Sequence, residues 1–225
     1  MNTTSYVYFF CALFLFSFCF DIHAQVYEFS SEEKGKHYQH RIFKDDNYLI
    51  ETIFGSNPSE FVLTRGGFYT TEENHVSVTF EFNSNFEKDG LKQQNYSPDA
   101  RWKNISKEER PLQGKWLMGG RVTDTGEQRR DLSSARKTMK ILYQGYFQWT
   151  AFNTESLAFF GAGGGTYTAA NGTYEEHLDY FSRDNSRVGA KLPFSYAQKE
   201  NDWYHKGLSS KGNPFHEIWT ARPRQ

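Results

Sequence analysis

The feature that most constrains the fold is a match of the chain with itself at an offset of 98 residues. Between Tyr48 and Ser84, nine residues are identical to the residue 98 positions later, where chance would supply about two. The identities pair Tyr48 with Tyr146, Thr52 with Thr150, Phe54 with Phe152, Phe61 with Phe159, Gly66-Gly67 with Gly164-Gly165, Tyr69-Thr70 with Tyr167-Thr168 and Ser84 with Ser182. Aromatic residues and glycines set packing and turns, so the match predicts two copies of one structural unit.

Short runs of alternating apolar and polar residues indicate that this unit is made of β-strands. Residues 76–82, 146–152 and 173–181 show the alternation, and 18% of the chain is aromatic. Asn171-Gly172 separates two such runs, as in a tight hairpin. The expected fold is therefore all-β, with antiparallel barrel units in two tandem copies or one composite barrel. Only Asp131 to Lys140 has the composition of a brief helical turn.

Residues 95–110 are polar and turn-rich, and residues 106–111 read as the linker between the copies. We expect a first unit over residues 25–110 and a second over residues 111–225. The first is shorter and has no clear equivalent of Gly114-Lys115-Trp116, so it is expected to be degenerate.

The first 24 residues resemble a signal peptide. The continuous apolar run from Tyr6 to Phe20 is short for a spanning helix, and Ile22-His23-Ala24 offers a cleavage site before Gln25. The absence of Lys and Arg before this run leaves an uncleaved anchor as the alternative. The protein is expected to be exported, to the periplasm or the medium.

Both cysteines, Cys11 and Cys19, lie in this leader. Phe18 occupies the position where a lipid-attachment motif requires a small residue, which argues against lipidation of Cys19. After cleavage no thiol remains for a disulfide, a catalytic cysteine or a metal. The net charge of -1 argues against nucleic-acid partners and a polybasic membrane patch, and no later stretch has the length of a membrane span.

A family resemblance begins at Gly114-Lys115-Trp116. A Gly-x-Trp on the first strand with a late arginine, here Arg222, is similar to the signature of lipocalins and the wider calycins. The second copy more closely resembles the lipocalin-like domain of unknown function found in bacterial "membrane or secreted" proteins. The matching residues are Lys137-Thr138-Met139-Lys140, Gly145-Tyr146-Phe147-Gln148-Trp149, residues 163–168, Tyr174-Glu175-Glu176-His177, Ser182-Arg183-Asp184, Val188-Gly189, Asp202-Trp203-Tyr204 and Glu217-Ile218-Trp219. The resemblance implies an exported antiparallel barrel in which Arg222 packs across Trp116, and it implies no activity.

Gly163-Gly164-Gly165 does not indicate a phosphate loop, because a strand pattern and not a helix follows it. Glycines in a strand more often mark a bulge or a close backbone approach. We therefore expect a structural role for these three residues.

Glu176 is the first candidate ligand-binding residue. Period-two alternation places Tyr174, Glu176, Leu178 and Tyr180 on one face of the strand, and the apolar character of that face indicates the barrel interior. A carboxylate among apolar side chains must pair, shift its pKa or contact a polar ligand. A position at the solvated barrel mouth is the alternative. The offset of 98 pairs Glu176 with Val78, so the carboxylate belongs to the second copy alone.

The remaining candidate ligand-binding residues are His205, Gln148, Trp203, Tyr146 and Tyr167. Trp203 and His205 share a strand face, whereas Phe147 and Trp149 face opposite to Tyr146 and Gln148. An aromatic interior with a few polar groups suits a small-molecule pocket, although a filled barrel has the same pattern. The histidines show no zinc-binding spacing, and no serine nucleophile motif is present. No metal, cofactor or catalytic residue is therefore expected.

The leading hypothesis is an exported lipocalin-like protein that binds a small hydrophobic or amphipathic ligand in its second barrel. One alternative is an envelope enzyme that acts on a small molecule or saccharide with a carboxylate/histidine pair. The other is a non-catalytic accessory or interaction module. The sequence leaves the oligomeric state open.

Overall fold

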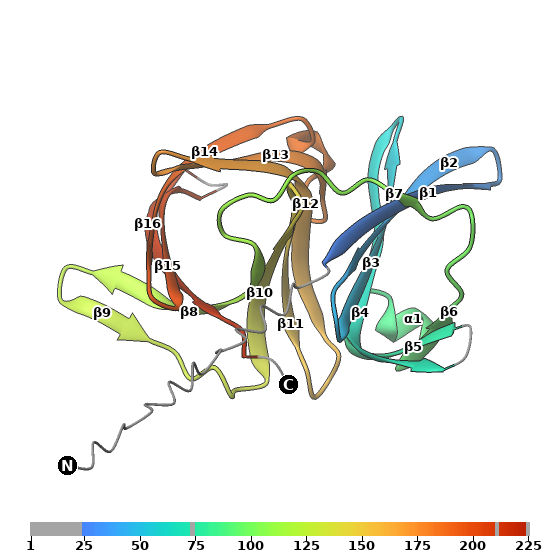
Figure 1. Cartoon of the computed structure of the whole chain (residues 1–225), viewed down its shortest axis with the longest axis horizontal. Coiled ribbons are helices and arrows are strands. Elements are labelled where there is room, and N and C mark those ends of the chain that lie inside the picture. Colours follow the sequence, from blue (N-terminus) through green and yellow to red (C-terminus); the bar gives the residue numbers. More distant parts are fainter. Residues whose placement is uncertain (1–23, 73–74, 210–211, 224–225) are drawn as a thin grey trace, which may run out of the picture.

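The computed structural model describes residues 24–72, 75–209 and 212–223. These residues form a closed antiparallel barrel beside an open antiparallel sheet (Figure 1). The prediction of an all-β fold is confirmed. The predicted signal peptide, apart from Ala24, lies outside the described residues, and its cleavage stays a prediction.

The open sheet has seven strands in the order β6-β5-β4-β3-β2-β1-β7. The strands are β1 (Gln25–Glu33), β2 (Lys36–Lys44), β3 (Tyr48–Ser56), β4 (Ser59–Glu72), β5 (His75–Asn83), β6 (Gln93–Tyr96) and β7 (Lys103–Asn104). The helix α1 (Phe86–Asp89) connects β5 to β6. Among the described residues β6 and β7 do not pair with each other, so this unit remains an open sheet.

The barrel is closed by eight strands, because β8 pairs with both β16 and β10. The strands are β8 (Gly114–Thr123), β10 (Arg136–Tyr143), β11 (Tyr146–Asn153), β12 (Phe159–Ala170), β13 (Thr173–Phe181), β14 (Lys191–Lys199), β15 (Asp202–Leu208) and β16 (Pro214–Ala221). A ninth strand, β9 (Gly126–Arg129), forms a hairpin with β8, and the 3₁₀ helix η1 (Asn185–Arg187) connects β13 to β14 (Figure 1).

The expectation of a helical turn over Asp131 to Lys140 is wrong. β10 starts at Arg136, and the preceding residues form a turn. The Asp131 carboxylate accepts hydrogen bonds from the backbone N–H and the hydroxyl of Ser133, at 2.8 and 2.7 Å. Such local side-chain bonds compete with helix formation, and here they close the turn instead.

The barrel and the sheet pack together through a shared apolar layer. The layer contains side chains from both parts of the molecule. The sheet contributes Val26, Phe43, Tyr48, Ile50 and Phe82, and the outer face of the barrel contributes Leu117, Met139, Ile141, Tyr143, Tyr146 and Phe152. The outer surface of barrel strands β8, β10 and β11 is therefore buried against the sheet. This explains why Leu117, Met139, Ile141 and Phe152 are apolar although they point out of the barrel, whereas a solvated barrel strand would be polar outside.

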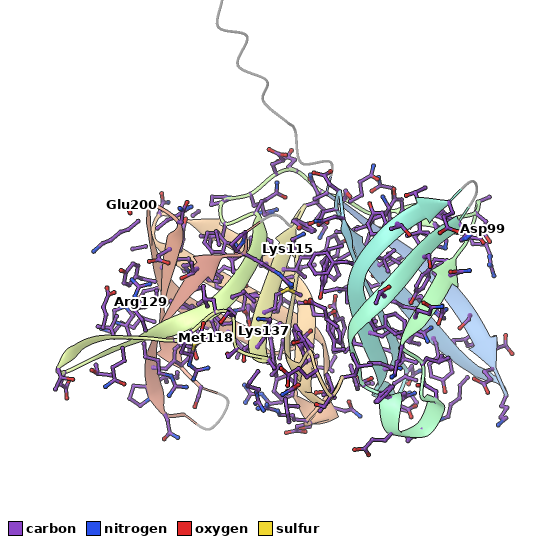
Figure 2. All side chains as sticks on the ribbon, turned by 90° about the horizontal axis from the view of Figure 1, so that it is seen from below. Asp99, Lys115, Met118, Arg129, Lys137 and Glu200 are labelled. Carbon is purple, nitrogen blue, oxygen red and sulfur yellow. The ribbon has the colours of Figure 1, made fainter. Side chains whose placement is uncertain are left out.

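Ion pairs and hydrogen bonds cross the same interface. Arg222 donates to both oxygens of Glu81 at 2.8 and 2.7 Å, and Arg41 lies 2.8 Å from the carboxylate of Asp179. Lys115, labelled in Figure 2 on its barrel strand, reaches the sheet and donates to Asn47 at 2.9 Å. Charged hydrogen bonds of this kind make the packing of the two parts specific.

Residues 98 positions apart hold corresponding places in the two sheets. A β-bulge interrupts β4 and β5 at Gly66/Gly67, and another interrupts β12 and β13 at Gly164/Gly165. At the interface Phe54 contacts Tyr180 and Phe82 contacts Phe152, in both cases with ring centroids 4.8 Å apart. These two contacts are related by the offset, and so each part presents the same aromatic positions to the other.

The expected structural role of Gly163-Gly164-Gly165 is confirmed. A Cβ atom on Gly165 would lie 1.9 Å from the carbonyl oxygen of His177, and one on Gly164 would lie 2.3 Å from the hydroxyl of Tyr180. No side chain fits at either distance, so β12 can approach its neighbours only with glycine here.

Candidate functional site

The interior of the barrel holds a cavity of about 400 Å³. Its floor and walls are largely aromatic and apolar, and they include Met118, Trp149, Ala151, Phe181, Leu192, Phe194, Phe215 and Trp219. Leu208 and Arg136, which are exposed, belong to the lining, so the cavity opens to solvent at this end. The opposite end is filled by a packed aromatic cluster that includes Trp116, Tyr167, Tyr174 and Trp203.

Glu176 lies in the cavity lining, on the inward face of β13, and is buried. Its Oε1 accepts hydrogen bonds from the Lys140 ammonium at 2.7 Å and from the Tyr174 hydroxyl at 3.0 Å. Lys140 comes from β10 and is equally buried. The carboxylate is therefore paired within the barrel, which is one of the outcomes that its apolar surroundings require.

Three aromatic rings surround the Lys140 ammonium. Its Nζ lies 5.0 to 5.2 Å from the ring centroids of Tyr174, Trp203 and Trp219. A cation over aromatic faces is stabilised by the ring quadrupoles. The ion pair and the rings together form a fixed polar floor beneath an apolar chamber.

His205 and Trp203 lie together inside the barrel, as their shared strand face predicts, but within the packed cluster and not on the cavity surface. Burial, with the nearby Lys140 charge, lowers the pKa of His205 to about 4, so the imidazole is neutral at neutral pH. Both ring nitrogens of His205 and the Nε1 of Trp203 are buried without a hydrogen-bond partner among the described residues.

Tyr146 and Gln148 face outward from the barrel and take part in the interface with the open sheet. The amide oxygen of Gln148 accepts from the Thr52 hydroxyl and the Tyr180 hydroxyl, both at 2.6 Å, and its nitrogen donates to Thr64 at 3.0 Å. Tyr146 packs under the guanidinium of Arg41. The structure thus places these two candidates away from the cavity.

Tyr167 points inward but belongs to the closed end, where its hydroxyl donates to the carbonyl of Pro111 at 3.2 Å. Of the six candidates, only Glu176 lines the cavity.

The inward face predicted for β13 is right for Tyr174, Glu176 and Leu178 but wrong for Tyr180. The bulge opposite Gly164/Gly165 adds one residue to β13 between Leu178 and Tyr180. Beyond it the alternation is reversed, so Phe181 points into the barrel and Tyr180 points to the interface.

Trp116 closes the far end of the barrel, and its Nε1 donates to the carbonyl of Leu112 at 2.8 Å. The guanidinium of Arg222 lies over the rings of Tyr48 and Phe68 in the open sheet, 5.2 and 5.0 Å from their centroids. The arginine that the family resemblance expects across the tryptophan thus instead joins the barrel to the sheet.

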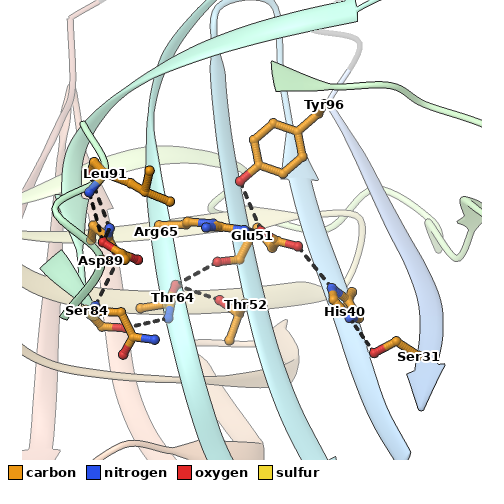
Figure 3. Close-up of polar contacts among 12 residues, drawn as sticks. Ser31, His40, Glu51, Thr52, Thr64, Arg65, Ser84, Asp89, Leu91 and Tyr96 are labelled. Atoms are coloured by element: carbon orange, nitrogen blue, oxygen red, sulfur yellow. Dashed lines mark hydrogen bonds and ion pairs between the residues drawn. The ribbon is translucent and has the colours of Figure 1, made fainter. Parts of the chain in front are cut away.

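The open sheet contains a second buried polar cluster, centred on Glu51 (Figure 3). One carboxylate oxygen accepts from Arg65 at 2.7 and 2.9 Å and from Tyr96 at 3.0 Å, and the other lies 3.0 Å from His40 Nδ1. Although burial opposes the charge, the bonds with His40 and Arg65 hold the pKa of Glu51 below its usual value. The pairing of these groups indicates a structural role.

A further cavity of about 420 Å³ lies where the barrel end meets the open sheet, beside Asp45 and Lys115. The Tyr143 hydroxyl donates to Asp45 at 2.6 Å, and the Lys115 ammonium pairs with the same carboxylate at 2.5 Å. Burial opposes the charge, yet Lys115 holds the pKa of Asp45 below its usual value. These contacts join the two parts of the molecule.

Sequence reasoning missed the five arginines around the barrel cavity, namely Arg121, Arg130, Arg136, Arg183 and Arg187. They come from β8, the segment before β10, β10 itself, the turn after β13 and η1. Because they are spread over 67 positions, no local charge cluster in the sequence indicates them.

No protein-family model and no curated protein matches the chain. In the described residues, no helix is long and apolar enough to cross a membrane. Over the same residues, no group of three or more histidine, cysteine, aspartate or glutamate side chains is arranged to hold a metal ion.

Proposed function

We propose that the protein is an exported, lipocalin-like binding protein that holds a small, partly apolar ligand in the barrel of its second unit. The observation that carries the proposal is the cavity of about 400 Å³, which has aromatic walls and one open end. This volume lies within the usual range of small-molecule sites, roughly 300–1,000 Å³. A closed eight-stranded antiparallel barrel of this kind is consistent with the family resemblance.

The polar floor supports binding more than catalysis. Glu176 accepts hydrogen bonds from both Lys140 and Tyr174, and aromatic rings surround Lys140. A general acid or base must instead exchange its proton with a substrate. His177, the histidine next to Glu176 on β13, lies on the opposite strand face, so these two side chains do not form a carboxylate/histidine pair. The open sheet would support the barrel through the shared apolar layer.

The proposal is tested by titration with N-phenyl-1-naphthylamine, an uncharged aromatic probe whose fluorescence increases in apolar surroundings. The wild-type protein is expected to bind it with quenching of the cavity tryptophans. The variant Ala151→Phe places a ring in the cavity and should weaken binding at least tenfold. The variant Ala197→Phe adds the same ring at an exposed position of β14 and serves as the matched control.

Thermal unfolding of all three proteins verifies that each is folded. Absence of probe binding to the wild type would refute the proposal, and so would equal affinities of the wild type and Ala151→Phe. Native mass spectrometry of the protein isolated under mild conditions then gives the mass of any ligand that co-purifies.

A further inference from the structure

The cavity is strongly cationic although the chain as a whole carries a net charge of only -1. Its lining contains six cationic and two acidic side chains. Lys140 is the cation of the floor, and the other five are the arginines of the rim: Arg121, Arg130, Arg136, Arg183 and Arg187. Low-dielectric walls concentrate the field of such charges at the opening.

The two acids of the lining already have partners. Glu176 is bound to Lys140 at 2.7 Å, and Glu217 accepts a hydrogen bond from the indole of Trp219 at 3.2 Å. Within the described part of the chain, no carboxylate oxygen lies within 4.0 Å of any rim arginine. The rim arginines therefore form no close ion pair, although Arg121 lies opposite Glu217 in the β8–β16 ladder and Arg187 is near Asp184.

Five arginines elsewhere in the chain have close carboxylate partners, whereas Arg110, in the segment before β8, has none within 4.0 Å among the described residues. Arg41, Arg65, Arg101, Arg129 and Arg222 each lie 2.6 or 2.7 Å from a carboxylate oxygen. Of the eleven arginines that the structure describes, five are thus tightly paired, and five of the six others gather around one opening. The contrast indicates that the rim charge serves a ligand and not the fold.

Two of the rim arginines are held in place by groups other than carboxylates. The guanidinium of Arg136 lies 3.5 Å from the ring centroid of Phe160, and Arg183 donates to the backbone carbonyl of the same residue at 3.3 and 3.1 Å. Arg187, on the adjacent η1, has a buried Nε with no hydrogen-bond partner among the described residues. Stacked and anchored guanidiniums keep N–H groups free for an anion and lose less entropy on binding it.

We infer that the ligand is an amphiphile with an anionic group such as a carboxylate, sulfonate or phosphate. Arg136, Arg183 and Arg187 bind this group at the rim, and the apolar part lies between Trp149 and Phe194. The inference rests on the proposed function and specifies the chemical class of the ligand.

A matched pair of probes tests the charge separately from the cavity. 1-Anilinonaphthalene-8-sulfonate is N-phenyl-1-naphthylamine with one added sulfonate, so the ratio of the two affinities reports what the anion contributes. The wild type is expected to bind the sulfonate at least tenfold more tightly, since charge-assisted hydrogen bonds from arginine are strong. The preference should shrink between 0.05 and 1 M NaCl, because salt screens exposed charges.

The triple variant Arg136→Gln/Arg183→Gln/Arg187→Gln should lose the preference and keep its affinity for the uncharged probe. Arg101→Gln is the control, because Arg101 pairs with Asp99 at the edge of the open sheet remote from the barrel (Figure 2). The three single variants, of which those at Arg136 and Arg183 alter exposed side chains, serve if the triple variant does not fold.

Equal affinities of the wild type for the two probes would overturn the inference and leave the proposed function intact. Failure of the wild type to bind the uncharged probe would refute the proposed function itself. Sedimentation with vesicles of phosphatidylglycerol and of phosphatidylcholine distinguishes the source of the anion. Capture by the anionic vesicles alone, lost in the triple variant and without any preference for the soluble sulfonate, would assign the arginines to a membrane surface and overturn the inference.

Discussion

Removal of one partner of the Lys140–Glu176 pair should strongly destabilise the protein. The two side chains are 4% and 5% exposed and their charged atoms are 2.7 Å apart, so Lys140→Met or Glu176→Leu leaves one buried charge without its partner. Loss of one member of a buried pair costs about 3–5 kcal/mol. For a chain of this size the cost corresponds to a decrease in Tm of roughly 10 °C.

The double variant Lys140→Met/Glu176→Leu should recover most of the loss, because two apolar side chains of similar volume can replace a buried pair at little cost. Urea unfolding followed by tryptophan fluorescence measures the free energy of unfolding of the wild type, the two single variants and the double variant, which together form a double-mutant cycle. The exposed pair Lys36–Glu60, at 3.2 Å, provides the matched control, and its removal should have no measurable effect. Single variants that cost less than about 1 kcal/mol, or a double variant whose cost is the sum of the two, would refute this account of the barrel floor.

Three other perturbations have definite expected outcomes. The pKa of His205 in the folded protein, about 4, lies below the value of about 6.5 in the unfolded chain, so the unfolded state binds more protons between these limits. Stability should therefore fall by about 2 kcal/mol as the pH decreases from 6.5 to 5, and His205→Phe should reduce this dependence; an unchanged pH profile in the variant would contradict the assignment. Replacing Gln148 by alanine removes the acceptor of the buried Tyr180 hydroxyl and the bonds of Gln148 to Thr52 and Thr64, which still bond to each other at 2.7 Å, and calorimetry should show a loss of about 2–3 kcal/mol. Gly165→Ala should prevent folding, as judged by circular dichroism, because its Cβ would lie 1.9 Å from the carbonyl oxygen of His177. Gly126→Ala meets no atom within 4 Å and should fold with a lower Tm, since its φ of +111° strains a residue with a side chain. Folded Gly165→Ala with an unchanged Tm would contradict the bulge geometry.

Local sequence pattern predicted the features that depend on neighbouring residues. The alternation in residues 173–181 places Tyr174, Glu176 and Leu178 inside the barrel, because side chains on one strand must alternate between faces. The glycines at 163–165 indicate a close approach of strands, which the structure confirms. The same pattern fails at Tyr180, since a bulge adds a residue that period-two reasoning does not anticipate.

The partners of the predicted residues could not be predicted from pattern. Lys140 lies 36 positions before Glu176 and reaches it only because the barrel places β10 and β13 around one interior. Gln148 was predicted to line the pocket, but it accepts a hydrogen bond from Thr52, which is 96 positions away in the other sheet. Alternation tells two strand faces apart, but it does not tell which face the rest of the molecule covers.

The sequence by itself determined that the chain forms antiparallel β-structure, that its glycines mark close strand contacts and that Glu176 faces the barrel interior. These properties follow from backbone geometry and from contacts between residues near each other in the chain. Only the tertiary structure decided that one unit closes into a barrel and the other stays open, and that five arginines from separate segments surround one cavity. The physical reason is that barrel closure, and the gathering of the arginines around one cavity, depend on contacts between segments far apart in the chain. A short stretch of sequence does not show which distant segments come into contact.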